Sequence, residues 1–306
     1  MHPLTDNLAT FGRHETFSLR YSWLTKGFCS VQKNSNIFSD DNATIELGVG
    51  KNMVHAIKYW LRASDMIEEV KGKISVTSLG ELLLDENGAD PFLEDEATLW
   101  LIHWQIATNA HLATAWFWFF NCFHKAEFSS DEAKKALSNF IVEHFKDKHY
   151  SIKTVQQEVV LLLRMYAPLK LVAGNSLDEI LDAPLANLNL ITYSDVNHLY
   201  CSAPQIRTNL PIEIIGFAIT EIFNNRNVVE MPLEELVCSK NQMVSVGAVF
   251  RLTENDLVAK LELLVEKYHT LYQIREKAGN RQLHKLKEIQ SSEFLKDYYE
   301  HAHKMD

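Results

Sequence analysis

The chain has 306 residues, of which 30 are Lys or Arg and 40 are Asp or Glu, so its formal net charge is −10. This length suggests two domains or a few small ones, and 46% hydrophobic residues are enough to fill ordinary cores, which excludes a disordered chain. The excess of acidic over basic residues excludes a protein that coats nucleic acid without sequence preference, because such a protein needs a basic surface. Any nucleic-acid site must therefore be a local basic patch.

The cysteine pattern and one long uncharged segment indicate where such a chain folds. The four cysteines are scattered without a Cys-x-x-Cys pair, which argues against a zinc finger or a disulfide framework and fits a reducing cytoplasm. We expect no signal peptide, because the first residues lack a basic segment followed by an apolar run. Residues 97–123 contain no Asp, Glu, Lys or Arg, but His and Asn side chains interrupt them. A pair of buried helices therefore fits this segment better than a membrane span does.

The order of elements in the first part of the chain is typical of a DNA-binding module. Apolar residues at helical spacing predict a helix over residues 11–28 and a stronger helix over residues 51–63, which a glycine-containing turn precedes. Two strand-like runs on either side of residues 71–73 predict a β-hairpin. Helix, short helix, turn, helix and hairpin is the order of a winged helix-turn-helix, which we assign to residues 1–88.

The rest of the chain is also predicted to be mainly helical. We expect a helical core over residues 89–171 and an irregular connecting region over residues 172–228. Residues 229–306 contain a long helical pattern followed by a glycine-centred turn, and they predict a second, winged-helix-like module. The expected fold is therefore mainly α, with a winged helix at each end and a helical middle.

The helix predicted over residues 51–63 carries a basic stripe. At 100° per residue its cations and a histidine fall within about 60° of one another, opposite an apolar face. Such a helix can enter a DNA major groove, and basic residues on the hairpin would add phosphate contacts. A solvated basic face is the alternative interpretation. The expected DNA contacts are Lys51, Asn52, His55, Lys58, Arg62, Lys71 and Lys73.

Charged residues in the first predicted helix form a second candidate group. His14 and Glu15 project about 100° apart, so they can hold one ion only with help from elsewhere. Glu15 can instead orient Arg13 or Arg20, and a polar helix face with local ion pairs is the alternative. We keep His14 and Glu15 as candidate catalytic residues, and Arg13 and Arg20 as candidate DNA contacts.

Carboxylates form a third group. Residues 74–124 contain no Lys or Arg, and their acidic residues are densest between residues 90 and 96. Clustered carboxylates repel one another, and Mg²⁺ relieves that repulsion while it activates a water molecule. Asp90, Glu94 and Asp95 are therefore candidate Mg²⁺ ligands and catalytic residues. The alternative is a helix start, in which Asp90 is the N-cap before Pro91 and the acids complement the helix dipole.

A second basic patch lies near the C-terminus around Gly279. Arg275, Lys277 and Arg281 are candidate contacts to the other DNA strand or to the flanking duplex, and a solvated surface is the alternative. The chain has no phosphate-binding glycine loop and no dinucleotide fingerprint. We therefore expect no nucleotide cofactor.

Three blocks of sequence resemble a known family. Residues 11–17 read FGRHETF, residues 47–54 read LGVGKNMV and residues 90–95 read DPFLED. They resemble the signatures of an uncharacterised bacterial domain family that is associated with DNA phosphorothioation islands, and weaker similarity covers nearly the whole chain. The chain departs from the family pattern at residue 277, where it has Lys in place of Thr.

The resemblance implies a DNA-nicking endonuclease, which opens one strand of double-stranded DNA so that sulfur can replace a non-bridging phosphate oxygen. It also implies three partners: a cysteine desulfurase, an ATPase and a sulfotransfer enzyme that resembles phosphoadenosine-phosphosulfate reductases. We therefore expect a cytoplasmic, Mg²⁺-dependent nicking endonuclease. A non-catalytic winged-helix adaptor or regulator that recruits partner enzymes is the alternative, and a pure protein-interaction scaffold is a third.

Overall fold

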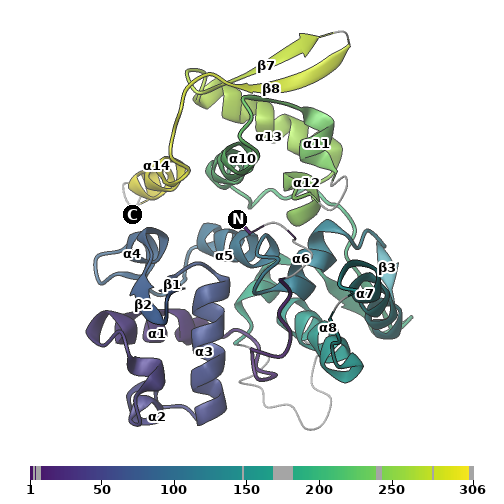
Figure 1. Ribbon diagram of the computed structural model, residues 1–306. Helices are drawn as coiled ribbons and strands as arrows, with labels where there is room; N and C mark the ends of the chain where they lie inside the picture. The colour runs from purple at the N-terminus through teal and green to yellow at the C-terminus, as the bar shows by residue number, and fades with distance from the viewer. Residues whose placement is uncertain are drawn as a thin grey trace. The chain divides into compact units, whose positions relative to one another are not determined.

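The structure is a computed structural model that describes residues 1–2, 4, 8–146, 148–167, 182–238, 243–277 and 279–302. These residues form helices and small antiparallel sheets, so the mainly helical class is confirmed (Figure 1). They group into two compact units. The N-terminal unit contains His2–Phe119 and Lys125–Ala203, and the C-terminal unit contains Met1, Phe120–His124 and Pro204–Asp306.

The first part of the N-terminal unit contains the predicted strong helix and hairpin. Helix α1 packs against α3 and α4, and the hairpin lies beside α3 (Figure 1). In chain order the elements are α1 (Tyr21–Lys33), η1 (Ile37–Ser39), α2 (Ala43–Leu47), α3 (Lys51–Ala63), β1 (Ile67–Val70), β2 (Lys73–Val76) and α4 (Ser78–Leu84). The prediction of a helix from residue 11 is wrong, because residues 12–16 form tight turns and α1 begins at Tyr21.

The remainder of the N-terminal unit is built around helix α5, which is buried on all sides from Ala97 to Ala107. Its central His103 meets the hydroxyl of Tyr166, with 2.8 Å between Nδ1 and the phenolic oxygen, so the buried polar groups pair with each other. The other elements are α5 (Glu96–Ala107), α6 (Thr114–Asn121), β3 (Glu127–Phe128), α7 (Ser130–His144), α8 (Ile152–Tyr166), η2 (Pro184–Leu188), β4 (Thr192–Ser194) and β5 (Leu199–Cys201).

The uncharged segment over residues 97–123 therefore forms two helices, as the sequence predicts. In the part of the chain that the structure describes, no helix has the length and apolarity needed to cross a membrane. All four cysteines are free thiols, which confirms that they form no disulfide framework.

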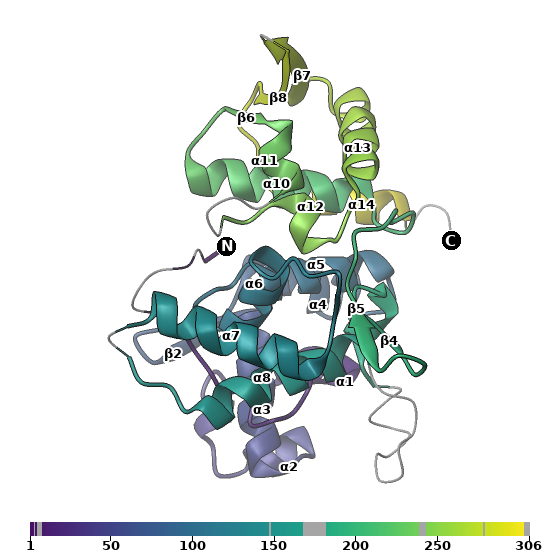
Figure 2. The ribbon, with the colours of Figure 1, turned by 90° about the vertical axis from the view of Figure 1, so that its right-hand side faces the viewer.

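The C-terminal unit packs α10 against α13 and α14, next to a sheet of strand order β6-β8-β7 (Figure 2). Its elements are α10 (Ile212–Arg226), β6 (Glu230–Pro232), α11 (Leu233–Val237), α12 (Val246–Val249), α13 (Glu254–Lys267), β7 (Tyr272–Lys277), β8 (Asn280–Lys285) and α14 (Ser292–Ala302). The expected long helix and the hairpin around Gly279 are both present, and the helix ends at Lys267.

The expected domain boundaries need correction. Residues 1–88 and 89–171 do not form separate units, because α1–α8 belong to one unit. The region 172–228 is not irregular throughout, since it contains the 15-residue helix α10, while residues 168–181 lie outside the described residues. Helix α10 is apolar on most of its surface, so its sequence shows little of the alternation that reveals a helix.

Arg251 fixes the short segment 120–124 to the C-terminal unit. Its guanidinium donates hydrogen bonds to the carbonyl oxygens of Phe120 and Phe123, at 3.2 and 3.0 Å. Burial lowers the pKa of Arg251 to about 10, so the group stays charged at neutral pH. A buried cation that makes several such bonds fixes the backbone it contacts.

Candidate functional site

Helix α3 presents the predicted basic stripe to solvent. Its apolar side, which includes Val54, Ile57, Trp60 and Leu61, is buried, and the helix begins after the extended residue Gly50. On the opposite side Lys51, Asn52 and His55 are exposed, while Lys58 and Arg62 are half-buried. The amphipathic interpretation of this segment is therefore confirmed.

A pocket of about 440 Å³ lies between this face of α3 and the N-terminal turn. It brings together five of the predicted site residues from two sequence blocks, with Tyr59 and Leu112 as apolar neighbours. The predicted residues that line it are Arg13, Glu15, His55, Lys58 and Arg62. The cavity is thus lined by the cationic side chains of Arg13, Lys58 and Arg62, together with one carboxylate and one imidazole. Such a set of charged hydrogen-bond donors is suited to binding a phosphate group.

The turn that supplies Arg13 and Glu15 has a strained backbone. Gly12, Glu15 and Thr16 have φ angles of 76°, 51° and 65°. Positive φ at two successive non-glycine residues, one of them β-branched, costs free energy and persists only where the surroundings impose it. Such strain is concentrated at functional sites, so this turn is the first place to expect function.

A buried pair beneath the turn imposes that conformation. His14 and Glu158 are each 1% exposed, and His14 Nε2 lies 3.0 Å from Glu158 Oε1. The backbone N–H of Thr16 donates to His14 Nδ1, while Nε2 is close to the carboxylate without forming a hydrogen bond to it. Glu158 also accepts the backbone N–H of Gly12, so one carboxylate holds two points of the turn.

His14 is therefore beneath the pocket and not among its lining residues. Its ring stacks on Trp60, with 6.2 Å between ring centroids and 14° between planes. Burial, and then the charge of Glu158, raises the pKa of Tyr59 well above its ordinary value. Tyr59 thus stays a phenol and donates its proton to the carbonyl oxygen of Leu112. The catalytic role of His14 stays a prediction, and its buried place suits a residue that positions Arg13 and Glu15.

Glu69 on strand β1 was not identified from the sequence. Its two carboxylate oxygens lie 3.1 Å from Lys58 Nζ and 3.1 Å from Arg62 Nη1. One half-buried carboxylate therefore offsets two cations of the pocket. The alternation of β1 contained the signal, since Glu69 lies on the same side of the strand as buried Ile67 and so faces α3.

The hairpin tip carries the other predicted basic residues. Lys71 and Gly72 have φ angles of 52° and 78°, as a two-residue type I′ turn requires. Lys71 and Lys73 are exposed and do not line the pocket. Arg20 is also outside it: its guanidinium lies over the Trp23 ring, 5.3 Å from the centroid.

The three predicted metal ligands occupy one loop but are used differently. Both oxygens of Asp90 accept backbone N–H groups, from Glu94 at 2.9 Å and from Asp95 at 3.0 Å. Asp95 is the N-cap of α5 and accepts the N–H of Ala97 at 2.8 Å. Glu94 is exposed and lines a separate cavity with Phe92. The N-cap interpretation is right for this segment, although the capping residue is Asp95 and not Asp90.

Among the described residues, no group of three or more His, Cys, Asp or Glu side chains is placed to hold a metal ion. The carboxylates of Asp90, Glu94 and Asp95 therefore do not form a ready-made ligand set, and their role in metal binding stays a prediction. Asp90 has a clear structural function, because its two hydrogen bonds fix the loop before α5.

The second basic patch belongs to the C-terminal unit. Arg275 donates from Nε to Gln273 at 2.9 Å, and Arg281 Nη2 lies 2.6 Å from Glu262 Oε1. Lys277 ends strand β7, and its side chain lies outside the described residues. The predicted DNA contacts of these residues stay predictions.

The fold and the pocket define a mainly helical protein with a cationic surface site. The chain belongs to the DUF4007 family, described as proteins of unknown function, whose model matches residues 11–299. It is similar to a crystal structure of magnesium ion-bound SspB, with a TM-score of 0.85, 28% identity, and coverage of 96% of this chain and 90% of that chain. A second SspB crystal structure has a TM-score of 0.84 with the same identity and coverage. No curated protein matches the chain.

The buried pair leads to a stability prediction. Glu158→Ala leaves the buried N–H of Gly12 without its acceptor and removes the carboxylate next to His14, so we expect the free energy of unfolding to fall by about 3 kcal/mol. Glu158→Gln keeps an acceptor oxygen and should lose less. Urea unfolding measures both, with Lys153→Ala, exposed on the same helix α8, as the control. A loss no larger than that of the control would show that the pair does not hold the turn.

Proposed function

We propose that this chain is a DNA-nicking endonuclease of a phosphorothioation system, and that the pocket beside α3 binds the scissile strand. The observation that carries the proposal is the convergence of Arg13, Lys58 and Arg62 with Glu15 and His55 in one cavity. Similarity to SspB structures and membership in the family support a role in phosphorothioation. The nicking component of the single-stranded phosphorothioation system is the protein that the sequence resembles.

The N-terminal elements support a winged-helix interpretation of DNA binding. Helix α3 takes the place of the recognition helix, with Lys51, Asn52 and His55 exposed at its first turns, and the hairpin tip takes the place of the wing. Lys71 and Lys73 then contact phosphates outside the pocket, while Asn52 and His55 reach base edges.

In the pocket, the roles follow from chemistry. Arg13, Lys58 and Arg62 bind the phosphate and stabilise the negative charge that grows during attack. Glu15 accepts a proton from the attacking water, and the leaving oxygen takes a proton from solvent, so the strand is broken by addition of one water. His14 acts indirectly, because it stabilises the turn that orients Arg13 and Glu15.

Mg²⁺ is the cofactor that we propose, and a bound ion would supply further positive charge at the phosphate. Mg²⁺ usually takes one or two protein carboxylates and completes its shell with water and phosphate oxygens. Glu15 and the exposed Glu94 are carboxylates that can serve in this way, whereas both oxygens of Asp90 already accept backbone N–H groups.

Plasmid nicking tests the activity. The full chain is incubated with supercoiled plasmid in Mg²⁺ or in EDTA, beside the variants Glu15→Gln, Glu94→Ala, Asp95→Ala and Asp90→Asn. We expect open-circular product in Mg²⁺ and about a hundredfold slower nicking by Glu15→Gln, because the proton acceptor is lost. If Glu15→Gln nicks at the wild-type rate while Glu94→Ala or Asp95→Ala loses nicking activity, the catalytic site is in the loop before α5 and not in the pocket. Salt-dependent binding without nicking would favour the adaptor.

Binding of duplex DNA is measured separately. Lys58→Ala combined with Arg62→Ala removes two phosphate contacts, so the slope of log affinity against log salt should become shallower by about 2. Lys125→Ala with Lys134→Ala, on the β3–α7 side of the same unit, is a control with the same loss of charge. Equal slopes for the two double variants would remove α3 from the interface.

Glu69 competes with DNA phosphate for Lys58 and Arg62. Glu69→Gln removes this competition, and we expect duplex affinity to rise about fivefold at moderate salt. Glu68→Gln is the matched control, because its carboxylate lies on the other side of the strand and accepts the hydroxyl of Ser75. Lower affinity in Glu69→Gln would mean that the carboxylate orients the two cations instead of competing for them.

A further inference from the structure

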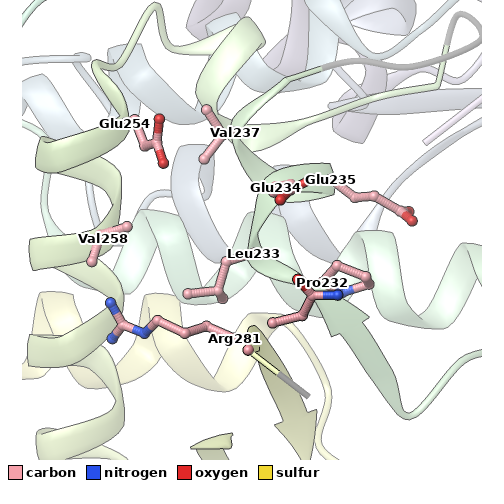
Figure 3. Close-up of a pocket in the computed structure, with 10 residues that line it drawn as sticks. Pro232, Leu233, Glu234, Glu235, Val237, Glu254, Val258 and Arg281 are labelled. Carbon is pink, nitrogen blue, oxygen red and sulfur yellow. The ribbon is translucent and has the colours of Figure 1, made fainter. Parts of the chain in front are cut away.

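The C-terminal unit contains a groove that the proposed function does not use. It has a volume of about 330 Å³ and lies between α11, α13 and the turn that joins β7 to β8 (Figure 3). Its apolar floor is formed by Leu233, Val237 and Val258. Its charged lining is mainly acidic, with the carboxylates of Glu234, Glu235 and Glu254 and the guanidinium of Arg281.

The outward face of α13 continues the acidic side of the groove. Leu257, Leu261 and Leu264 are buried, while Glu254, Asn255, Glu262 and Glu266 are exposed. Lys267 at the end of the helix is paired with Glu213 and Asp297, at 2.7 Å from each. The exposed side of the helix therefore carries negative charge.

The lining cations do not reverse this charge. Arg281 reaches from β8 towards α13 below Val258, and its Nη2 lies 2.6 Å from Glu262 Oε1 (Figure 3). Arg226, next to the groove, has its Nη1 3.0 Å from Glu235 Oε2, and Glu254 is the lining carboxylate on the α13 side. A cationic ligand is favoured at Glu254.

The two units of this chain present corresponding helices with opposite charge. In both, a helix is followed by a short helix, a second helix and a β-hairpin. The helix before the hairpin is basic in the N-terminal unit, with Lys51, Lys58 and Arg62, and acidic in the C-terminal unit, with Glu254 and Glu262. One sequence thus carries two such modules, whose helices before the hairpin differ in the sign of their charge.

We propose that the groove between α11, α13 and the β7–β8 turn docks a segment of a partner protein in which basic and apolar side chains alternate. Its apolar side chains lie on Leu233 and Val258. Its cations pair with Glu254 and displace Arg281 from Glu262. Complementary charge at the rim raises the association rate and favours a cationic partner. The apolar residues of the groove add binding free energy, because the partner's apolar side chains leave water when they pack on them. This inference does not depend on nicking activity or on the pocket beside α3.

The probe is a fluorescein-labelled peptide in which arginine and leucine alternate, and binding to the full chain is measured by fluorescence anisotropy. We expect Glu254→Lys combined with Glu262→Lys to weaken binding about tenfold and to flatten its salt dependence. Val258→Ser should weaken binding without changing the salt dependence, because it alters only the apolar floor. If the charge reversal unfolds the unit, as thermal unfolding would reveal, Val258→Ser alone decides.

The matched control reverses two exposed glutamates of the N-terminal unit, Glu127→Lys with Glu143→Lys, and so changes net charge equally. A peptide in which aspartate replaces arginine controls for apolar binding. Equal loss in the control variant, or no loss in Val258→Ser, would overturn the proposal. It would also be overturned if Arg275→Ala with Arg281→Ala reduced duplex DNA affinity as strongly as Lys58→Ala with Arg62→Ala, because the module would then bind DNA.

Discussion

The buried contact between His14 and Glu158 is the interaction on which the candidate site depends. It joins residues that are far apart in sequence, and the same carboxylate also accepts the N–H of Gly12. Hydrogen bonds within the turn, from the N–H of Glu15 to Gly12 and from the N–H of Phe17 to His14, add to its effect on the positive φ angles of Glu15 and Thr16. The buried pair thus stabilises the turn that places Arg13 and Glu15 next to α3. If residues 12–16 formed a regular helix, neither side chain would point towards α3.

The pocket also depends on the packing of α3. Trp60 lies under the turn, stacks on His14 and donates its indole N–H to the carbonyl oxygen of Phe17. Tyr59, its neighbour, borders the pocket and is anchored to Leu112. The same helix therefore supplies the apolar support of the turn on one side and the cations on the other. Phosphate ligands on a packed helix are held more accurately than ligands on a free loop.

Periodicity was sufficient to predict the parts of this site that are local in sequence. Lys51, His55, Lys58 and Arg62 lie on one face because a helix places them there, and the Lys71-Gly72 turn follows from the residues that such turns require. The turn at residues 12–16 was not predictable in this way, since its apolar spacing continues that of α1. Its conformation is set by Glu158, which no local pattern connects to His14.

The carboxylates show a second limit of what local sequence can predict. Acidic residues at 90–96 suggested a metal site by density, yet hydrogen bonds to backbone N–H groups account for Asp90 and Asp95. Glu69 was overlooked because it stands alone, although it faces both cations of the pocket. What a carboxylate does depends on which donors surround it in space, and sequence density does not report this.

The net charge of −10 gives these local arrangements their importance. Over distances beyond the Debye length an acidic protein gains no general attraction to DNA, so productive contact requires that the basic face meets the duplex in the right orientation. Glu69 neutralises part of the basic face of α3. The exposed side of α13, in contrast, carries carboxylates. Uneven charge on one acidic chain can thus assign different ligands to two modules of similar element order.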